Sequence, residues 1–600
     1  MRDGTILRAD VHRPGGGAER PLPTVLLRTP YDKSRDYAEL DPRAYLDRGF
    51  AVVVQDVRGR YRSEGSHYHG RDEVEDGYDT LEWIAAQPWS DGKVGMTGLS
   101  YPAAVQCAAA CSGTERLVSM FHVKSPANYY LSGARRGASS LGYVLPIELL
   151  FACTSPEALA DPTLARALRE SFARAPDWMG RLPLRAGRNP LASVPDVERF
   201  YLDVQEHSEY TDFWKANRLW SPEEHVDEFT DTAALFVGGW YDLFREDRMY
   251  SLLRRRGDRP VRLLMGPWCH RDFAATVGDV DFGPSAALSP DRYTELQLEW
   301  FEETLQGVPP SGPRPPVTVF VMGGGTGRRT ADGRLDHGGR WRTADDWPLS
   351  ATRFTPYYLH GGGRLLPDVP PGEPQRPSRY VHDPDAPVPT IGGTGFFLRD
   401  TVLDARAEGR AQTDDDLWVP YGPQDQRERL GVFGCSSDLP LSSRTDVLTF
   451  ETEPLPADVE VTGPIEVTLW ISSSATDTDF VVKLVDVYPP NEDYPHGYAM
   501  NLGDGVLRAG YREGFERRVP LEPGEAYELR IGPELMYPTA NLFCRGHRIR
   551  LHIASSDYPA YDVNGGHGER AGDGVPVRAL NTIYHEPGRL SRVVLPVIPA

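Results

Sequence analysis

Three residues whose side chains could together cleave an acyl bond each follow a short apolar run of the chain. A serine, an aspartate and a histidine can serve as nucleophile, orienting carboxylate and general base in acyl transfer. They occur along the chain in the order Ser100, Asp242 and His270. The apolar runs before them are Val94–Met96, Ala233–Val237 and Val261–Met265. If each run is a strand of one parallel sheet, the three side chains lie at the carboxyl ends of the strands, where such sheets build their sites.

The segment around Ser100 has the pattern of a nucleophile elbow. The chain passes from Gly98 and Leu99 through Ser100 directly into an alanine-rich segment that begins with Tyr101 and Pro102. A serine on a strand-to-helix turn presents its hydroxyl above the sheet, and the helix N-terminus behind it offers backbone N–H groups to an oxyanion. Pro102 suits a first helical position, where its missing N–H costs nothing. We therefore expect Ser100 to be the nucleophile.

The order serine, aspartate, histidine is that of α/β-hydrolases, whereas chymotrypsin-like and subtilisin-like enzymes order the same groups differently. We expect His270 to take the proton of Ser100 and return it to the leaving group. Asp242 would orient the imidazole and stabilise its protonated form. This chemistry requires neither a metal ion nor an organic cofactor, and we predict none.

The elements that would position these residues alternate strands with helices. Apolar runs at 24–27, 51–54, 94–96 and 118–123 read as strands, and strands resume at 233, 261 and 317–321. A helix with a capping serine is expected from Ser289 past Trp300. Strands that alternate with helices predict a parallel sheet with crossover helices.

Two further regions differ in pattern from this sheet. Residues 128–228 lack strand runs, and 141–153, 156–172 and 196–217 look helical, so we expect a helical cap over the strand ends. Beyond 348 the chain alternates without helices: Ile549, Leu551 and Ile553 face one way, with Arg548, Arg550 and His552 opposite. We predict an α/β-hydrolase domain (1–127 and 229–347), an inserted helical cap (128–228) and a C-terminal all-β jelly roll (348–600).

Composition is that of a soluble globular enzyme, with 25% charged and 40% hydrophobic residues. A net charge of -21 argues against nucleic acid or an anionic membrane as a partner. The six cysteines form no C-x-x-C pair, and free thiols are expected. The chain shows no signal-peptide core at Met1 and no uninterrupted apolar run of membrane-spanning length, so we expect a cytoplasmic protein. The sequence leaves a homo-oligomer open.

Several motifs resemble the hydrolase family that groups X-prolyl dipeptidyl peptidases, α-amino-acid ester hydrolases and bacterial cocaine esterase. The likeness runs nearly end to end, and the motifs together are highly specific. They are Met1-Arg2-Asp3-Gly4, Arg28-Thr29-Pro30-Tyr31-Asp32-Lys33, Gln55-Asp56-Val57-Arg58-Gly59, Gly98-Leu99-Ser100-Tyr101, Gly238-Gly239-Trp240-Tyr241-Asp242, Gly266-Pro267-Trp268-Cys269-His270, Asp477-Thr478-Asp479-Phe480, Lys483-Leu484-Val485-Asp486-Val487 and Ser555-Ser556-Asp557-Tyr558-Pro559. The resemblance implies the same three parts as the patterns above. It also implies that the Tyr31 hydroxyl and the N–H of Tyr101 hold the oxyanion.

The chain departs from the family pattern in two places. Ala103 stands where the family has glycine, and it is small enough for the elbow to form. Phe244 and Arg245 stand where the amino-ester hydrolases carry acidic residues that bind an ammonium group, which weakens the case for an α-amino substrate. Phe244 instead resembles a phenylalanine that packs on an aromatic acyl group in cocaine esterase, and Phe396 of the jelly roll would add a second wall to the substrate pocket.

Two other motifs have plain structural interpretations. His67 and His69 could suggest metal ligands, but such pairs in a polar loop are more often solvated. Asp477 and Asp479 lack the spacing and glycine of a calcium loop, which favours a connection between strands.

The expected function is hydrolysis of carboxylic esters of a small-molecule substrate through an acyl-enzyme. Three alternatives stay open. The chain could be an amidase or peptidase on X-Pro or acylated amino groups, or an acyltransferase of secondary metabolism with the same machinery. A glycan-binding protein with an idle hydrolase core is the third, and the complete set of Ser100, Asp242 and His270 speaks against it.

Overall fold

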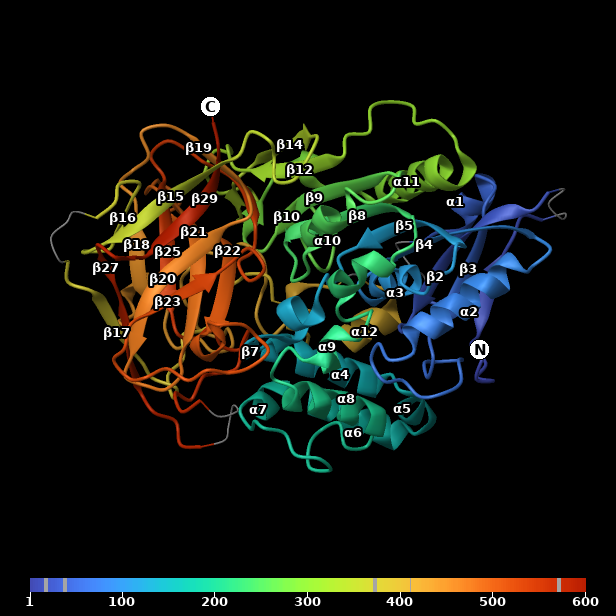
Figure 1. Ribbon diagram of the computed structural model, residues 1–600, viewed down its shortest axis with the longest axis horizontal. Coiled ribbons are helices and arrows are strands. Elements are labelled where there is room, and N and C mark those ends of the chain that lie inside the picture. The colour runs from blue at the N-terminus through green and yellow to red at the C-terminus, as the bar shows by residue number, and fades with distance from the viewer. Residues whose placement is uncertain are drawn as a thin grey trace.

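The computed structural model describes residues 1–15, 20–35, 40–370, 375–395, 397–410, 412–568 and 574–599. Figure 1 shows a sheet with flanking helices at the right, a group of helices below its centre, and a strand-rich part at the left. We call the helices of residues 128–228 the cap and the strand-rich part beyond 348 the β domain.

The central sheet is parallel except at its edges. Its strand order is β1 (Ala9–His12), β3 (Ala51–Asp56), β2 (Leu22–Thr29), β4 (Ser90–Leu99), β5 (Leu117–Val123), β8 (Ala233–Tyr241), β9 (Val261–Cys269), β12 (Val317–Met322) and β14 (Gly339–Ala344). β1 and β14 run antiparallel to their neighbours. β2, β3, β5 and β8 are buried along their whole lengths, as expected for parallel strands covered on both faces.

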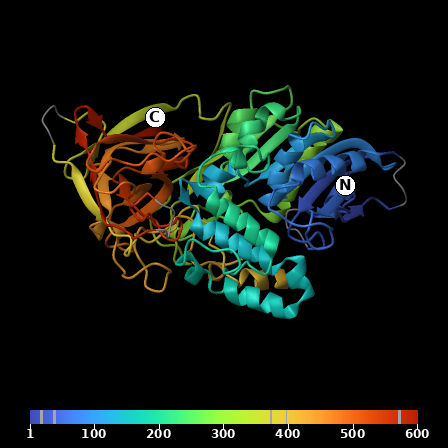
Figure 2. The same cartoon turned by 60° about the horizontal axis from the view of Figure 1, so that its bottom comes forward.

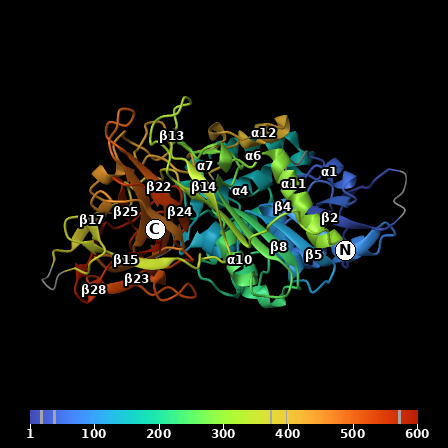
Figure 3. The same cartoon turned by 90° about the horizontal axis from the view of Figure 1, so that it is seen from above.

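Two layers of helices cover the sheet, and neighbouring residues of one strand face different layers. Leu26 of β2 packs with Leu81 of α2 (Glu73–Ala85), in a core shared with α3 (Tyr101–Ala110) and α10 (Glu246–Leu253). Val25, next in the strand, packs with Tyr45 of α1 (Pro42–Asp47) and Phe301 of α11 (Pro290–Phe301). Figure 3 shows α11 lying across the strands.

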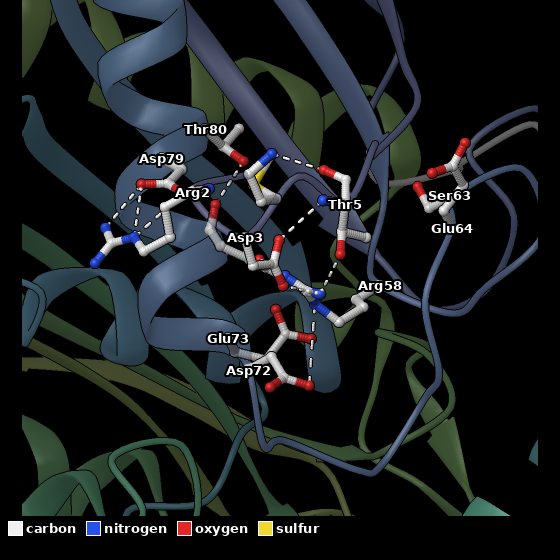
Figure 4. A network of polar contacts seen from close by, with 12 residues as sticks. Arg2, Asp3, Thr5, Arg58, Ser63, Glu64, Asp72, Glu73, Asp79 and Thr80 are labelled. Carbon is white, nitrogen blue, oxygen red and sulfur yellow. Dashed lines mark hydrogen bonds and ion pairs between the residues drawn. The ribbon is translucent and has the colours of Figure 1, made fainter.

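The segment before β1 is held against α2 by ion pairs. Arg58 Nη1 lies 2.6 Å from Asp3 and 2.7 Å from the hydroxyl of Thr5, and Arg58 Nη2 lies 2.6 Å from Asp76. Arg2 pairs with Asp79 of the same helix at 2.7 Å (Figure 4). The first residues are thereby fixed beside the central sheet.

The cap contains α4 (Leu141–Cys153), α5 (Pro156–Ala160), α6 (Pro162–Phe172), α7 (Ala175–Met179), α8 (Pro195–Glu206) and α9 (Asp212–Lys215). The single helix expected over 156–172 is split at Asp161, whose carboxylate accepts the N–H of Thr163 and caps α6. The helix expected over 196–217 ends at Glu206, and only α9 follows it. Figure 2 brings the cap forward, with the gold helix α12 (Val402–Glu408) of the later chain against it. Arg169 of α6 pairs with Asp404 of α12.

The stretch Leu141–Ala160 is long and apolar enough to cross a membrane by length and composition, with a mean hydropathy of 1.2. About 61% of its most apolar window is buried inside the protein, and the stretch consists of two helices. Buried helices in protein cores can be equally long and apolar, and nearly all residues of α4 are buried in this way.

The β domain is built from strands that pair antiparallel with one another, except in one case. They are β15 (Arg353–His360), β16 (Arg364–Leu366), β17 (Ser378–His382), β18 (Leu448–Glu451), β19 (Val459–Gly463), β20 (Glu466–Ser473), β21 (Asp479–Tyr488), β22 (Tyr498–Arg508), β23 (Tyr527–Ile531), β24 (Thr539–Phe543), β25 (Arg548–Ala554), β26 (Ala579–Ile583) and β29 (Arg592–Ile598). β18, β25, β21 and β22 pair in that order, and β17, β26, β20 and β23 pair likewise. The exception is β16 and β18, which pair in parallel. Met322 of β12 pairs with Asn541 of β24, and this pairing joins the central sheet to the β domain.

The alternation expected in β25 is present, but the outer face of the strand is buried near its end. Ile549, Leu551 and Ile553 are fully buried as expected, but His552 on the opposite face is buried too. The outer face at this end of the strand is covered, because Val388 and neighbouring apolar residues pack on Ala554. Burial lowers the pKa of His552 to about 3, and it is neutral there.

Candidate active site

Ser100 lies on a sharp turn between β4 and α3. Its φ of 68° and ψ of −124° are rarely adopted by residues other than glycine and cost of the order of 1–3 kcal/mol. The turn needs Gly98, because a Cβ there would lie 2.3 Å from the Cβ of Pro102. The Ser100 carbonyl accepts the N–H groups of Ala103 at 2.9 Å and Ala104 at 3.0 Å. The elbow therefore forms with alanine at position 103, and strain of this kind is typical of a functional residue.

Asp242 and His270 form a buried pair on two adjacent parallel strands. Asp242 follows β8 and His270 follows β9, and the two strands pair in parallel with a shift of register between Gly239 and Tyr241. His270 Nδ1 lies 2.9 Å from Asp242 Oδ2, and Asp242 Oδ1 accepts the N–H of Phe244 at 2.8 Å. Asp242 is 0% exposed and His270 is 8% exposed. A carboxylate bound to Nδ1–H leaves Nε2 as the basic nitrogen of a neutral imidazole.

Tyr31 follows β2 and lies beside the elbow. Its hydroxyl interacts with the side chain of Ser100, and its ring stacks on Phe151 of α4 at 6.0 Å between centroids. The guanidinium of Arg406 on α12 lies 5.0 Å from the centre of the Tyr31 ring. Burial raises the pKa of the Tyr31 hydroxyl, while Arg406 and then the bond with Ser100 oppose that rise. The hydroxyl is a neutral donor held next to the serine.

The side chain of Tyr101 anchors the first turn of α3. Its hydroxyl donates to Glu73 at 2.8 Å and accepts the N–H of Gly70 at 3.2 Å. Glu73 also forms an ion pair of 2.9 Å with the buried Arg28. Burial, and then the charge of Glu73, raises the pKa of Tyr101 well above its ordinary value. The Tyr101 side chain is therefore not available to an oxyanion. Its backbone N–H, at the start of α3, can serve that role.

The expectation that His67 and His69 are solvated is wrong. Both are buried, and their rings lie 6.0 and 5.1 Å from the ring of Tyr101. His69 Nδ1 lies 3.1 Å from Glu148 of α4, and burial lowers the pKa of His67 well below its ordinary value. The cap covers this loop, which the sequence alone did not indicate. Within the described ranges no group of His, Cys, Asp and Glu side chains could hold a metal ion.

The residues expected to line a substrate pocket have different placements. The Phe244 ring is buried edge-on to the His270 ring at 5.5 Å and to Tyr143 of α4 at 6.0 Å. Phe396 lies outside the described residues. Arg245 points away from His270: it pairs with Asp247 at 2.9 Å and donates to the carbonyl of Pro533 at 2.9 Å.

A hollow adjoins Tyr143 and Leu243. Segments far apart in the chain line it, from Ser132 of the cap to Phe397 and Lys483 of the β domain. Lys483 forms an ion pair of 2.8 Å with Asp557. The sequence analysis missed Tyr143, Phe151 and Arg406 near the site, because no motif marks residues that cap packing and a distant helix bring to it.

Comparisons with known proteins agree with this arrangement. The model of the X-Pro dipeptidyl-peptidase (S15 family) matches residues 3–272, and that of the X-Pro dipeptidyl-peptidase C-terminal non-catalytic domain matches residues 312–594. The chain is 33% identical over 632 residues to the cocaine esterase of Rhodococcus sp., covering 100% of this chain and 97% of that protein. It is 26% identical to a putative serine esterase of Mycobacterium bovis, covering 100% and 94%.

Solved structures show the same fold. An aminopeptidase from a marine sediment archaeon, Thaumarchaeota archaeon, has a TM-score of 0.76 at 22% identity, covering 100% of this chain and 95% of that one. An α-amino acid ester hydrolase has a TM-score of 0.72 at 23% identity, with the same coverage. The expected fold class, an α/β-hydrolase with a C-terminal domain of strands, is confirmed.

Proposed function

This chain belongs to the X-Pro dipeptidyl-peptidase (S15) family of hydrolases, with an esterase among its relatives, and from that premise we propose that it cleaves carboxylic esters through an acyl-enzyme on Ser100. The observation that carries this proposal is the buried pair of Asp242 and His270 at the strand ends, together with Ser100 on its strained turn. The neutral Tyr31 hydroxyl, which interacts with Ser100, can supply a donor to the oxyanion of an ester.

In the proposed reaction the Ser100 oxygen attacks the ester carbonyl carbon while His270 Nε2 takes the serine proton. Asp242 holds the imidazole by Nδ1 and stabilises its protonated form. The Tyr31 hydroxyl and the Tyr101 N–H bind the tetrahedral oxyanion. His270 then gives its proton to the departing alcohol, and the same groups activate water to release the acid and restore Ser100. The alcohol thus receives the proton of Ser100 through His270, and water returns a proton to Ser100 by the same route when the acid is released.

The walls of the site favour an uncharged, apolar or aromatic acyl group. Phe244 packs beside His270, and Phe151 stacks on Tyr31. Arg245 stands at a position where amino-ester hydrolases carry an acidic residue. Its guanidinium is bound to Asp247 and to the β domain. We assign the alcohol portion of the substrate to the hollow beyond Tyr143, where polar side chains such as Lys483 contribute to the lining.

The test is a panel of phenyl and ethyl esters of acetate and benzoate beside X-Pro anilides, with wild type, Ser100→Ala and Ser112→Ala. Ser112 lies just beyond the end of α3 and makes only a local bond to Ala109, so it is the matched control. We expect ester turnover to fall by about a millionfold in Ser100→Ala, the scale of triad knockouts, and to stay unchanged in Ser112→Ala.

Turnover of X-Pro anilides alone would move the assignment to a peptidase, which the family also contains. Ester turnover that survives Ser100→Ala would overturn the proposed nucleophile. Acyl transfer to an added alcohol that outpaces hydrolysis would indicate an acyltransferase instead.

A further inference from the structure

A second hollow lies between the cap and the β domain. On the cap side it is lined by Arg135 and Ser139, from the hairpin of β6 (Arg135–Arg136) and β7 (Ala138–Ser139), and by residues of α8. On the other side Arg508 and Arg518 line it. We call it the arginine pocket. Ser139 belongs to this hollow and Ser140 to the one beside Tyr143, so the end of the hairpin separates the two.

Two of the three arginines are already paired with carboxylates. Arg508 lies 2.8 Å from Asp479 and 3.1 Å from Asp562. Arg518 lies 3.3 Å from Asp477. Asp562 in addition accepts the N–H of Ser139 at 2.6 Å. These carboxylates are therefore committed to Arg508, Arg518 and the hairpin backbone.

Arg135 has no such partner. Its side chain is buried, with 6% exposed, and Nη1 donates to the carbonyl of Val204 at 3.2 Å. Nε makes no hydrogen bond, and across the described ranges Arg135 forms no ion pair with a carboxylate. A buried guanidinium without a counter-charge is unfavourable, because desolvation is not offset by an opposite charge. Arg135 thus places a positive charge at the wall of the arginine pocket, where it can pair with an anion.

The remaining walls decide what kind of anion fits. Val144, Leu182, Pro183 and Val204 supply apolar surface. Asp562 also lines the hollow and would repel a doubly charged phosphate more strongly than a monoanion. The planar fork of a guanidinium matches a carboxylate in two parallel hydrogen bonds. We propose that the arginine pocket binds a small organic carboxylate, with its carboxylate on Arg135 and its apolar part against Val144 and Leu182.

The test measures binding of benzoate to the full-length protein by titration calorimetry and by the shift of the unfolding midpoint. Neutral benzamide, inorganic phosphate and sodium chloride at equal ionic strength are the control solutes. The variants are Arg135→Gln, Arg135→Lys and Arg188→Gln, which removes an exposed arginine of the same cap. Benzoate should bind wild type and Arg188→Gln alike and raise their midpoints, because a ligand that binds the folded state stabilises it.

We expect Arg135→Gln to weaken benzoate binding at least about tenfold and Arg135→Lys to weaken it less, since lysine keeps the charge but loses the fork. Without ligand, Arg135→Gln should unfold no earlier than wild type, because the substitution removes an uncompensated buried charge. Equal benzoate binding by wild type and Arg135→Gln would place the ligand elsewhere and overturn the proposal. So would binding of benzamide as tight as that of benzoate, binding of phosphate alone, or no benzoate binding to wild type.

Discussion

At the scale of single residues, Tyr31 is the donor on which the proposed oxyanion site depends most. Its hydroxyl interacts with Ser100, whereas the side chain of Tyr101 is committed to Glu73. Tyr31→Phe keeps the ring on Phe151 and removes only the hydroxyl, so we expect kcat to fall by about a hundredfold to a thousandfold with little change in KM. Steady-state kinetics on a phenyl ester measures this. Tyr68→Phe, which removes a hydroxyl bound to Asp203 in the cap, is the control; equal kcat in the two variants would exclude Tyr31 from the oxyanion site.

Arg406 acts on the same hydroxyl from a distance. Its charge opposes the burial that raises the pKa of Tyr31, and a hydroxyl of lower pKa donates a stronger hydrogen bond to an oxyanion. We expect Arg406→Gln to lower kcat by about two- to thirtyfold, corresponding to about 0.5–2 kcal/mol for a cation on an aromatic ring, and Arg406→Lys to restore most of it. The pH dependence of kcat for the three proteins is the measurement. A loss of the same size in the lysine and glutamine variants would assign Arg406 a packing role only.

The sequence could predict the residues that follow strands, and it could not predict those that packing brings in. Ser100, Asp242 and His270 each end an apolar run, so their common edge follows from parallel strands, although their catalytic roles stay a prediction. Phe151 and Arg406 carry no local signal, because a cap helix and a segment beyond the central sheet place them. The two histidines of the 67–69 loop look solvated in the sequence and are buried only because the cap covers them.

At the scale of elements, the buried pair of His122 and Glu246 joins β5 to the start of α10, behind Asp242. His122 Nδ1 lies 2.9 Å from Glu246 Oε2, both side chains are 0% exposed, and Glu246 Oε1 accepts the Ser125 N–H at 2.6 Å. Glu246→Gln leaves a buried imidazolium unpaired, and we expect it to lower the free energy of unfolding by about 3–5 kcal/mol. Urea unfolding measures this. Glu295→Gln, which breaks an exposed pair with Arg48, should cost no more than about 1 kcal/mol. Equal losses in the two variants would contradict a charged pair.

The same pair predicts a pH dependence of stability. Burial lowers the pKa of His122, but Glu246 and then Cys107 raise it by more. The pKa is therefore about 10, against an ordinary value of 6.5. A histidine whose pKa is raised by folding contributes its full stabilisation below the unfolded value and loses it as the pH passes the folded value. Wild type should therefore lose stability between about pH 6.5 and pH 10 relative to Glu246→Gln. Urea unfolding of both proteins at several pH values checks this, and parallel curves would show that His122 is neutral in the fold.

The inner strands of the central sheet were predictable because each contains a short apolar run, as with β3 and β5, whereas the edge strands β1 and β14 carry no such run and were not predicted. The bounds of the cap helices were less predictable from the sequence. The pattern over 156–172 continues through Asp161 and Pro162, yet Pro162 cannot donate to the preceding helix, and Asp161 caps a new one. Alternation in β25 correctly gave the two faces of the strand, but it could not show that His552 is buried, because burial of the outer face depends on a segment far away in the sequence.

At the scale of the whole molecule, the β domain supports the loop that carries Asp242. The Tyr241 hydroxyl donates to the carbonyl of Asn501 at 3.0 Å, and the Tyr537 hydroxyl donates to that of Leu243 at 2.6 Å. Arg245 donates to the carbonyl of Met536 at 3.1 Å. The residues on both sides of Asp242 are thus bonded to a part of the chain some 260 to 290 positions away. A domain that holds this loop contributes to the site without supplying a group of the proposed triad.

Tyr537→Phe tests that support directly. The variant leaves the buried Leu243 carbonyl without its hydroxyl donor, which costs about 1–3 kcal/mol and frees the backbone next to Asp242. We expect kcat to fall by roughly tenfold with little change in KM, because a small displacement of Asp242 misorients His270. Tyr511→Phe removes a similar bond from the β domain to the carbonyl of Ser208 in the cap, away from Asp242. Both variants should lower the unfolding midpoint, and only Tyr537→Phe should lower kcat. A loss of kcat common to both would mean that the β domain acts by general stability, whereas a loss confined to Tyr537→Phe would make it a positioning element for the aspartate.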